Sequence, residues 1–327
     1  MGVGELIGKL FGGTEASNET LLRAYGKLPM YAEYRRLEVS PGAPTAFSQW
    51  MDAGRLAWVK ASSKSGAGAT RASRLMINIP ESKDIVVANV WDSRDSLGRV
   101  FPFSFFAVCP AVAFGPDPVE QWVCALTMHR TFERTHAELR SLGTGGNFYR
   151  LFQKRSMPLR SEDVPQRAAD LRADAARISA RAWFDTIPHD EGVDAGAWFA
   201  GLLRRIERWK AEPARLAEAA LSCPLSAEFP FDTQVVLWLE WMRAASTKLG
   251  RRIALLVPAE SERSAGAVHL LLRDVLADDF QLLTSDDANY GYIERLNGVP
   301  NGNDAAAAPA PEGSLLNWLA QHAPQGA

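Results

Sequence analysis

Residues 85–91 limit the possible folds of this chain more than any other segment, because nearly every position there is apolar. A strand of that composition must be covered on both faces, as the central strands of α/β proteins are. Segments 75–79 and 100–108, on either side of it in the sequence, are rich in β-branched and aromatic residues and are also predicted to be strands. The sequence therefore predicts a sheet whose strand at 85–91 is covered on both faces.

The clearest helix signal begins at Asp117, whose carboxylate can accept hydrogen bonds from the N–H groups of a first helical turn. Pro118 suits the first helical position, and Glu120 lies three residues after the cap. We expect this helix to run to Leu142. An earlier helix is predicted around Trp50, where apolar residues recur at spacings of three and four and form one buried face.

The C-terminal half contains a segment of different character, residues 160–221, which is rich in Arg, Ala and Asp and has no strand-like run. Small apolar residues recur every three or four positions from 164 to 182. This spacing predicts a helix with a narrow apolar seam along one face, within an added helical block. Two more helices are predicted to start at the caps Asp194 and Asp232, the second ending at Gly250. Two further strands are predicted at 253–257 and 268–272.

The predicted organisation is a short amphipathic segment at 1–20, one α/β domain at 21–296 and a tail at 297–327. The tail is rich in Ala and Pro, a composition typical of flexible linkers. Within it, the leucine-rich residues 315–319 are predicted to form a small docking helix.

The composition argues against several classes of protein. The formal net charge is −2 with acidic and basic residues interspersed, which gives no electrostatic basis for binding nucleic acid. The start of the chain does not resemble a signal peptide, and no apolar run is long enough to span a bilayer. An odd number of widely spaced cysteines favours buried thiols in a reducing compartment, so we expect a cytoplasmic protein. The three cysteines are Cys109, Cys124 and Cys223.

The search for catalytic residues finds one candidate cluster, formed by His129, Glu133 and His136 on one face of the predicted helix. The two histidines are seven residues apart, whereas a helical pair of metal ligands usually has a spacing of three or four. The chain has no Gly-x-Ser-x-Gly elbow, and Cys109 has no basic neighbour that would lower its pKa. The sequence therefore predicts a protein without catalytic residues, metal or cofactor, and a metal-dependent hydrolase is kept as an alternative.

A short motif near the N-terminus, Gly26-Lys27-Leu28-Pro29, follows a predicted strand at 21–25. Gly26 allows a turn conformation that other residues resist, and Pro29 prevents the strand from continuing. It is not a phosphate-binding loop, because the required upstream glycine is missing and Leu28 follows the lysine.

Together with a second motif, this segment resembles the TagF/ImpM family, whose members are encoded with bacterial type VI secretion systems. The second motif runs from Asp95 to Ser104 and includes Gly98-Arg99-Val100-Phe101-Pro102. The resemblance covers about residues 22–110. Ala32-Glu33-Tyr34 stands where the family usually has Gly-Asp-Phe. By this resemblance, the residues with structural roles are Gly26, Leu28, Pro29, Trp50, Gly98, Phe101 and Pro102.

The resemblance implies a layered α-β-α sandwich with a central mixed sheet. It also implies a non-enzymatic, post-translational repressor of type VI secretion that binds the forkhead-associated scaffold protein of that system. We expect unpaired basic residues near the motifs to include partner-facing residues. The simpler interpretation of these residues is solvated or locally paired structural charges. A structural adaptor that docks through the helical block and the tail is a further alternative. The candidate partner-facing residues are Lys27, Arg35, Arg36 and Arg99.

Overall fold

The computed structural model of the chain describes residues 18–61, 70–142, 147–152, 155–187, 194–258, 266–284, 293–296 and 312–322. Most of the predicted amphipathic segment 1–20 lies outside these ranges, as does the Ala/Pro-rich part of the predicted tail. The described residues form two sheets, one of nine strands and one of two.

The large sheet has the strand order β11-β8-β10-β9-β4-β5-β6-β2-β3. Neighbouring strands are antiparallel except β11 and β8, which are parallel, so the sheet is mixed as predicted. In chain order its strands are β2 (Arg23–Gly26), β3 (Arg35–Leu37), β4 (Ser73–Asn78), β5 (Asp84–Trp91), β6 (Phe103–Pro110), β8 (Ala220–Pro224), β9 (Ala254–Pro258), β10 (Ala267–Leu271) and β11 (Ile293–Arg295). The small sheet pairs β1 (Glu19–Leu21) with β7 (Ser156–Pro158).

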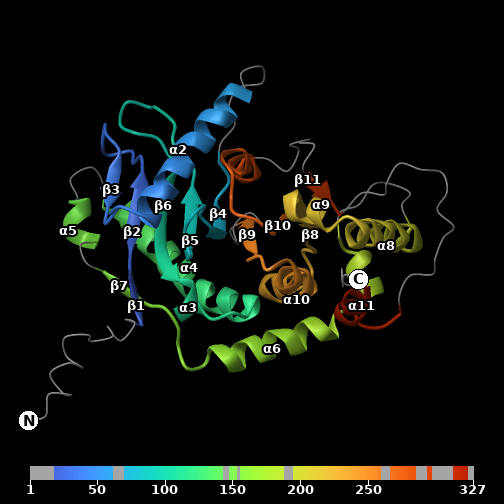
Figure 1. Cartoon of the computed structure of the whole chain (residues 1–327). Helices are drawn as coiled ribbons and strands as arrows, with labels where there is room; N and C mark the ends of the chain where they lie inside the picture. The colour runs from blue at the N-terminus through green and yellow to red at the C-terminus, as the bar shows by residue number, and fades with distance from the viewer. Residues whose placement is uncertain are drawn as a thin grey trace, which may run out of the picture.

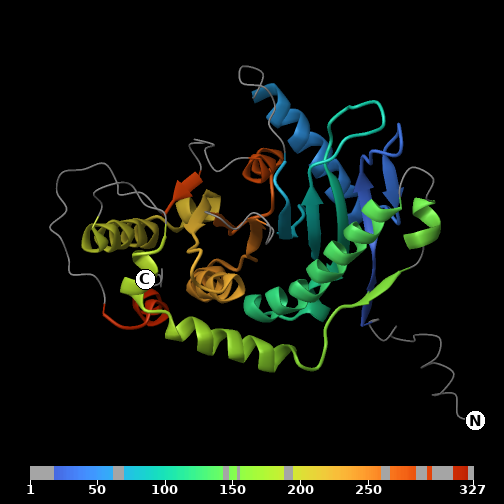
Figure 2. The same cartoon turned by 180° about the vertical axis from the view of Figure 1, so that it is seen from behind.

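Helices cover both faces of the large sheet, which gives the predicted α-β-α layering (Figures 1 and 2). Alternate residues of β5 point to opposite faces. Val86 shares a buried core with Phe47 of α2 (Ala43–Ala61) and with residues of the short helix η2 (Ala277–Leu283). Val87 shares the other core with Trp122 of α4 (Pro118–Ser141) and Trp238 of α10 (Phe231–Leu249). Burial on both faces is what the apolar run at 85–91 predicts.

The start of α4 confirms the cap predicted from the sequence. The Asp117 carboxylate accepts hydrogen bonds from the backbone N–H groups of Val119 at 2.8 Å and Glu120 at 3.3 Å. The Glu120 side chain pairs with Arg160 instead of turning back to the cap. Two short helices flank α4, namely α3 (Ala111–Phe114) and α5 (Phe148–Phe152).

The predicted helical block contains α6 (Val164–Arg177), α7 (Ala180–Phe184), α8 (Ala195–Ala211) and α9 (Pro213–Glu218). Helix α6 lies beneath α4 and α10 in Figure 1 and packs against both. Arg172 of α6 joins them electrostatically. Its Nη2 atom lies 2.6 Å from Oδ2 of Asp117, and its Nε atom lies 2.5 Å from Oε1 of Glu240 on α10.

Three boundaries differ from the predictions because tertiary contacts override local signals. Strand β8 occupies residues 220–224, at the end of a segment predicted to be free of strands, and it is fixed by pairing with β10 and β11. Helix α10 begins at Phe231 after Pro230, so Asp232 lies in the first turn and is not the cap. The apolar seam at 164–182 is not one helix, because Ile178 is extended and Ser179 caps α7 separately.

The three cysteines are buried and unpaired, as predicted. Burial raises the pKa of each thiol, that of Cys124 to about 11. These thiols are therefore protonated at neutral pH and unsuited to nucleophilic attack. Among the described helices, none combines the length and the apolar character needed to span a membrane.

The predicted C-terminal docking helix exists as α11 (Leu315–His322), and it docks on this chain itself. Leu315 and Leu319 are fully buried, and α11 packs against α6, α7 and α10. The Trp318 ring meets the Phe199 ring edge-on, with 4.8 Å between their centroids. The buried side of α11 is therefore not available to another protein, as the adaptor hypothesis for this segment would require.

We predict that Leu319→Ala lowers the free energy of unfolding by about 2–4 kcal/mol, because it leaves a cavity in a packed core. Gln321→Ala changes an exposed residue of the same helix and should shift stability by less than about 0.5 kcal/mol. Urea denaturation followed by far-ultraviolet circular dichroism measures both. Equal stability of the two variants would mean that α11 does not contribute to the core.

Candidate functional site

The two motifs are distant in the sequence but lie side by side in the sheet, where Gly26 of β2 pairs with Phe103 of β6. Gly26 has φ +133°, a backbone conformation that residues with a Cβ rarely adopt. A Cβ at this position would lie 2.2 Å from the carbonyl oxygen of Pro102. Only glycine permits this close approach of β2 to the backbone of Pro102.

Lys27 and Asp95 join the motifs through a buried ion pair. The Lys27 Nζ atom lies 3.0 Å from Oδ2 of Asp95, and the two side chains are 8% and 0% exposed. The Asp95 carboxylate also accepts the backbone N–H groups of Leu97 at 3.0 Å and Arg99 at 2.9 Å. Burial by itself would raise the pKa of Asp95, but the hydrogen bonds from Lys27 and Arg99 outweigh it and hold this pKa well below its usual range.

Further hydrogen bonds hold the β5–β6 loop against the segment that follows Pro29. The Arg99 Nε atom donates to Asp95 at 2.6 Å, and its Nη2 atom donates to the Ala32 carbonyl at 2.5 Å. The Ser96 N–H donates to the Tyr31 carbonyl at 2.9 Å. We call residues 25–37 and 92–103 together the Asp95 unit.

Aromatic rings complete the Asp95 unit. Tyr34 stacks on Tyr25 with 5.7 Å between ring centroids and meets Phe101 edge-on at 4.9 Å. The Tyr25 hydroxyl donates to the carboxylate of Asp52 on α2 at 2.8 Å, which ties the unit to that helix. Burial and this hydrogen bond raise the pKa of Tyr25, so it remains protonated and continues to donate.

The four basic residues expected to face a partner are in different environments. Lys27 is buried and paired, so the expectation that it is an unpaired surface charge is wrong. Arg99 is half exposed, but its guanidinium is held by Asp95 and Ala32. The partner role of Arg35 and Arg36 stays a prediction.

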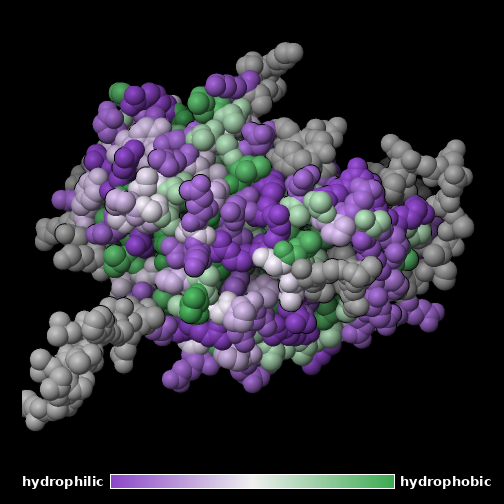
Figure 3. All heavy atoms as spheres, viewed as in Figure 1, coloured by the Kyte–Doolittle hydropathy of each residue, from purple (hydrophilic) through white to green (hydrophobic). Residues whose placement is uncertain are grey.

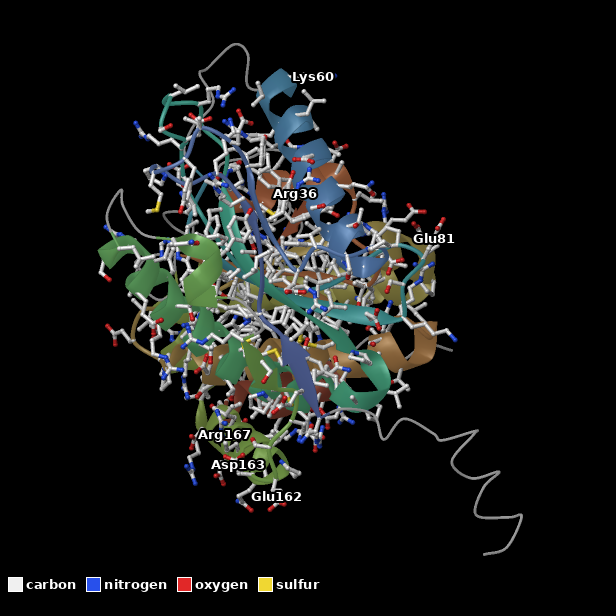
Figure 4. The ribbon with its side chains drawn as sticks, turned by 90° about the vertical axis from the view of Figure 1, so that its left-hand side faces the viewer. Arg36, Lys60, Glu81, Glu162, Asp163 and Arg167 are labelled. Atoms are coloured by element: carbon white, nitrogen blue, oxygen red, sulfur yellow. The ribbon has the colours of Figure 1, made fainter. Side chains whose placement is uncertain are left out.

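Arg35 and Arg36 lie on β3, at the edge of the large sheet. Arg35 is half-buried, with its guanidinium 3.6 Å from the centre of the Tyr31 ring. Arg36 is exposed and lies 5.4 Å from the centre of the Tyr25 ring (Figure 4). Arg36 and Arg99 are therefore the two of the four residues that are exposed.

The other motif residues are divided between core and surface. Leu28, Phe101 and Trp50 are buried, and the Trp50 indole donates to the Leu276 carbonyl at 2.8 Å. Gly98 is exposed in the turn that Asp95 begins. Pro29 is exposed where the chain leaves β2.

A pocket of about 660 Å³ opens beside the Asp95 unit. Leu28 and Pro29 form one side, the end of β5 forms another, and the C-terminal half of α4 forms a third. The ring of His136 on α4 stacks on that of Trp91, with 4.0 Å between centroids and 11° between planes. Burial and the nearby Arg140 lower the pKa of His136 to about 4, so its ring is neutral at physiological pH.

The structure does not assemble the metal site considered from the sequence. His129 is completely buried, and its Nδ1 atom lies 2.5 Å from Oδ1 of Asn89 on β5. Glu133 binds Arg74 of β4 at 2.8 Å, while His136 stacks on Trp91. In the part of the chain that the structure describes, no three His, Cys, Asp or Glu side chains are grouped to hold a metal ion.

Sequence reasoning missed the role of Asp95, although the residue lies in a recognised motif. The local signal was present, since Asp at the first and Gly at the fourth position is typical of a β-turn. Nothing local indicated that Lys27 would be its partner. The contact of Tyr25 with Asp52 was missed for the same reason.

Comparisons with known proteins find little similarity. No protein-family model matches the chain, and no curated protein matches it. One solved structure with limited similarity is PA0076 from Pseudomonas aeruginosa, with 19% sequence identity and a TM-score of 0.26. The matched region spans 36% of this chain and 62% of that protein. This match is too weak to assign a family or an activity.

We predict that Gly26→Ala lowers the free energy of unfolding by at least about 3 kcal/mol, because backbone strain and a clash with Pro102 act together. Gly98→Ala is the matched control. Gly98 also has a positive φ, +81°, but a Cβ there would meet nothing within 4 Å. Its expected cost is about 1 kcal/mol, from strain alone. Equal losses in urea denaturation would contradict the close approach at Gly26.

The Asp95 pair should make stability depend on pH. Because the folded-state pKa of Asp95 is lowered, its contribution is complete above the unfolded-state pKa of about 4 and is lost as the pH falls below it. Wild type should therefore exceed Asp95→Asn in urea midpoint at neutral pH, and the difference should narrow in acid. Asp185→Asn, which alters an exposed pair with Arg181, is the control. A difference that does not vary with pH would refute the prediction.

Proposed function

We propose that this protein is a cytoplasmic regulator of bacterial type VI secretion of the TagF/ImpM kind. It acts without catalysis, by binding the forkhead-associated scaffold protein, and thereby represses secretion after translation. The observation that supports this proposal is the joining of the two family motifs around one buried carboxylate, Asp95. Residues that resemble a family in two separate places thus belong to a single structural unit.

The exposed side of the Asp95 unit has the chemistry of a protein-binding surface. Tyr34, Leu97 and Val100 are 37%, 68% and 42% exposed, although they are large apolar or aromatic residues. Arg36 and Arg99 add accessible guanidinium groups. Tyr and Arg are enriched in interfaces, and Arg binds carboxylates through paired N–H donors. An acidic surface on the scaffold protein would suit these residues.

Rigid support should favour binding through this unit. Asp95 fixes the loop that carries Leu97, and the contact of Tyr25 with Asp52 holds the aromatic rings against α2. A surface that is ordered before binding loses less conformational entropy when the partner arrives. The face shown in Figure 3 mixes hydrophilic and hydrophobic residues and has no single continuous apolar area.

The alternative of an assembly adaptor differs from a repressor in its expected effect on secretion. Removing a repressor should increase type VI secretion, whereas removing an adaptor should abolish it. The comparison of a gene deletion with wild type distinguishes the two functions.

The binding surface is tested by Arg36→Glu in a pull-down with the purified scaffold protein. We expect at least tenfold weaker binding, equivalent to about 1.4 kcal/mol, because the charge reversal would repel an acidic partner. Arg167→Glu is the control, because Arg167 lies on α6, far from Arg36 in Figure 4. Equal binding by wild type and both variants would exclude this surface, and no binding by wild type would refute the proposed partner.

A further inference from the structure

The pocket beside the Asp95 unit has no role in the proposed binding surface and has the properties of a ligand site. Its volume of about 660 Å³ falls within the range of small-molecule sites, roughly 300–1,000 Å³. Apolar groups of Leu28, Pro29 and Leu139 line it together with polar and charged groups. Such a combination usually binds a ligand that has an apolar part and one charged group.

Trp91 and His136, which line the pocket, are the outer two rings of an aromatic stack. Phe103, buried in the core, lies 6.4 Å from His136 at an angle of 22°, and His136 lies 4.0 Å from Trp91. Trp91 is the outermost ring of the stack and is partly exposed. Among the described residues, no ring stacks on its other face. A planar ligand could extend this stack by one layer.

Two arginines at the pocket, Arg94 and Arg140, are exposed and have no salt bridge or side-chain hydrogen bond to any residue that the structure describes. Most other arginines near α4 have acidic partners: Arg74 binds Glu133, and Arg160 binds Glu120. The pocket also contains one acid, Asp92, which accepts a hydrogen bond from the Thr70 N–H at 3.2 Å. Because the His136 ring is neutral at physiological pH, two positive charges face one negative charge.

We propose that this pocket binds a small planar aromatic molecule that carries a carboxylate or a phosphate group. The ring lies along the Trp91–His136 stack, and the anionic group takes N–H donors from Arg94 and Arg140. This ligand site is independent of the proposed regulatory function. Because residues 28–30 and 92–94 belong to both the pocket and the Asp95 unit, a bound ligand would lie next to the proposed protein-binding surface.

Calorimetric titration of the full-length protein tests the proposal with two anionic probes, adenosine monophosphate and indole-3-acetate. Adenosine, indole and inorganic phosphate are the controls for the ring and the anion alone. We expect saturable binding of at least one anionic probe and much weaker binding of its neutral counterpart.

Three variants locate the binding site. Arg94→Ala and Arg140→Ala should each weaken binding about tenfold, while Arg134→Ala, an exposed residue of α4 that does not line the pocket, should have no effect. The indole N–H signal of Trp91 in the nuclear magnetic resonance spectrum, assigned by its loss in Trp91→Phe, should shift on binding. The proposal is overturned if neither probe binds at millimolar concentration, if the arginine variants bind like Arg134→Ala, or if the Trp91 signal does not move.

Discussion

A buried Lys27 ammonium requires a negative partner, and the carboxylate of Asp95 supplies it. The same carboxylate accepts two backbone N–H groups of its own loop and the Arg99 side chain. Each contact removes conformational freedom from a segment that would otherwise be a long surface loop. The buried pair need not add much stability, because desolvating two charges is costly. Its effect is on conformation, since it brings the two motifs into one arrangement.

A second group of buried polar residues connects the sheet to helix α4. Arg74 of β4 and Asn89 of β5 both contact Glu133 of α4, and Asn89 also lies against His129. Burial lowers the pKa of His129 well below its ordinary value, so the ring stays neutral among these partners. His129 and Glu133 were candidate metal ligands in the sequence because the residue types that bind metals also form buried hydrogen-bond networks. Their partners in the sheet account for them as structural residues.

Local signals correctly predicted much of the fold. The apolar run at 85–91 lies in the middle of a sheet, and Asp117 caps α4. The predictions failed where neighbours in space decide the conformation. Strand β8 has the sequence Ala-Leu-Ser-Cys-Pro, which has no run of β-branched residues, and it is a strand because β10 and β11 pair with it. The candidate site was predicted less well, since Lys27 proved buried and the pocket at Trp91 and His136 combines four distant segments.

The sequence by itself determined where the chain turns, which helices begin at a cap and which strand must be covered on both faces. These features depend on backbone preference and on hydrophobic periodicity, which act between residues close in sequence. The tertiary structure decided which charges are paired, which rings stack and which basic side chains remain accessible. Lys27 and Arg36 look alike as basic residues of one motif region, yet one is buried against Asp95 and the other is exposed beside Tyr25. That difference follows from the pairing of strands that are distant in the sequence, so it cannot be inferred from the spacing of the residues.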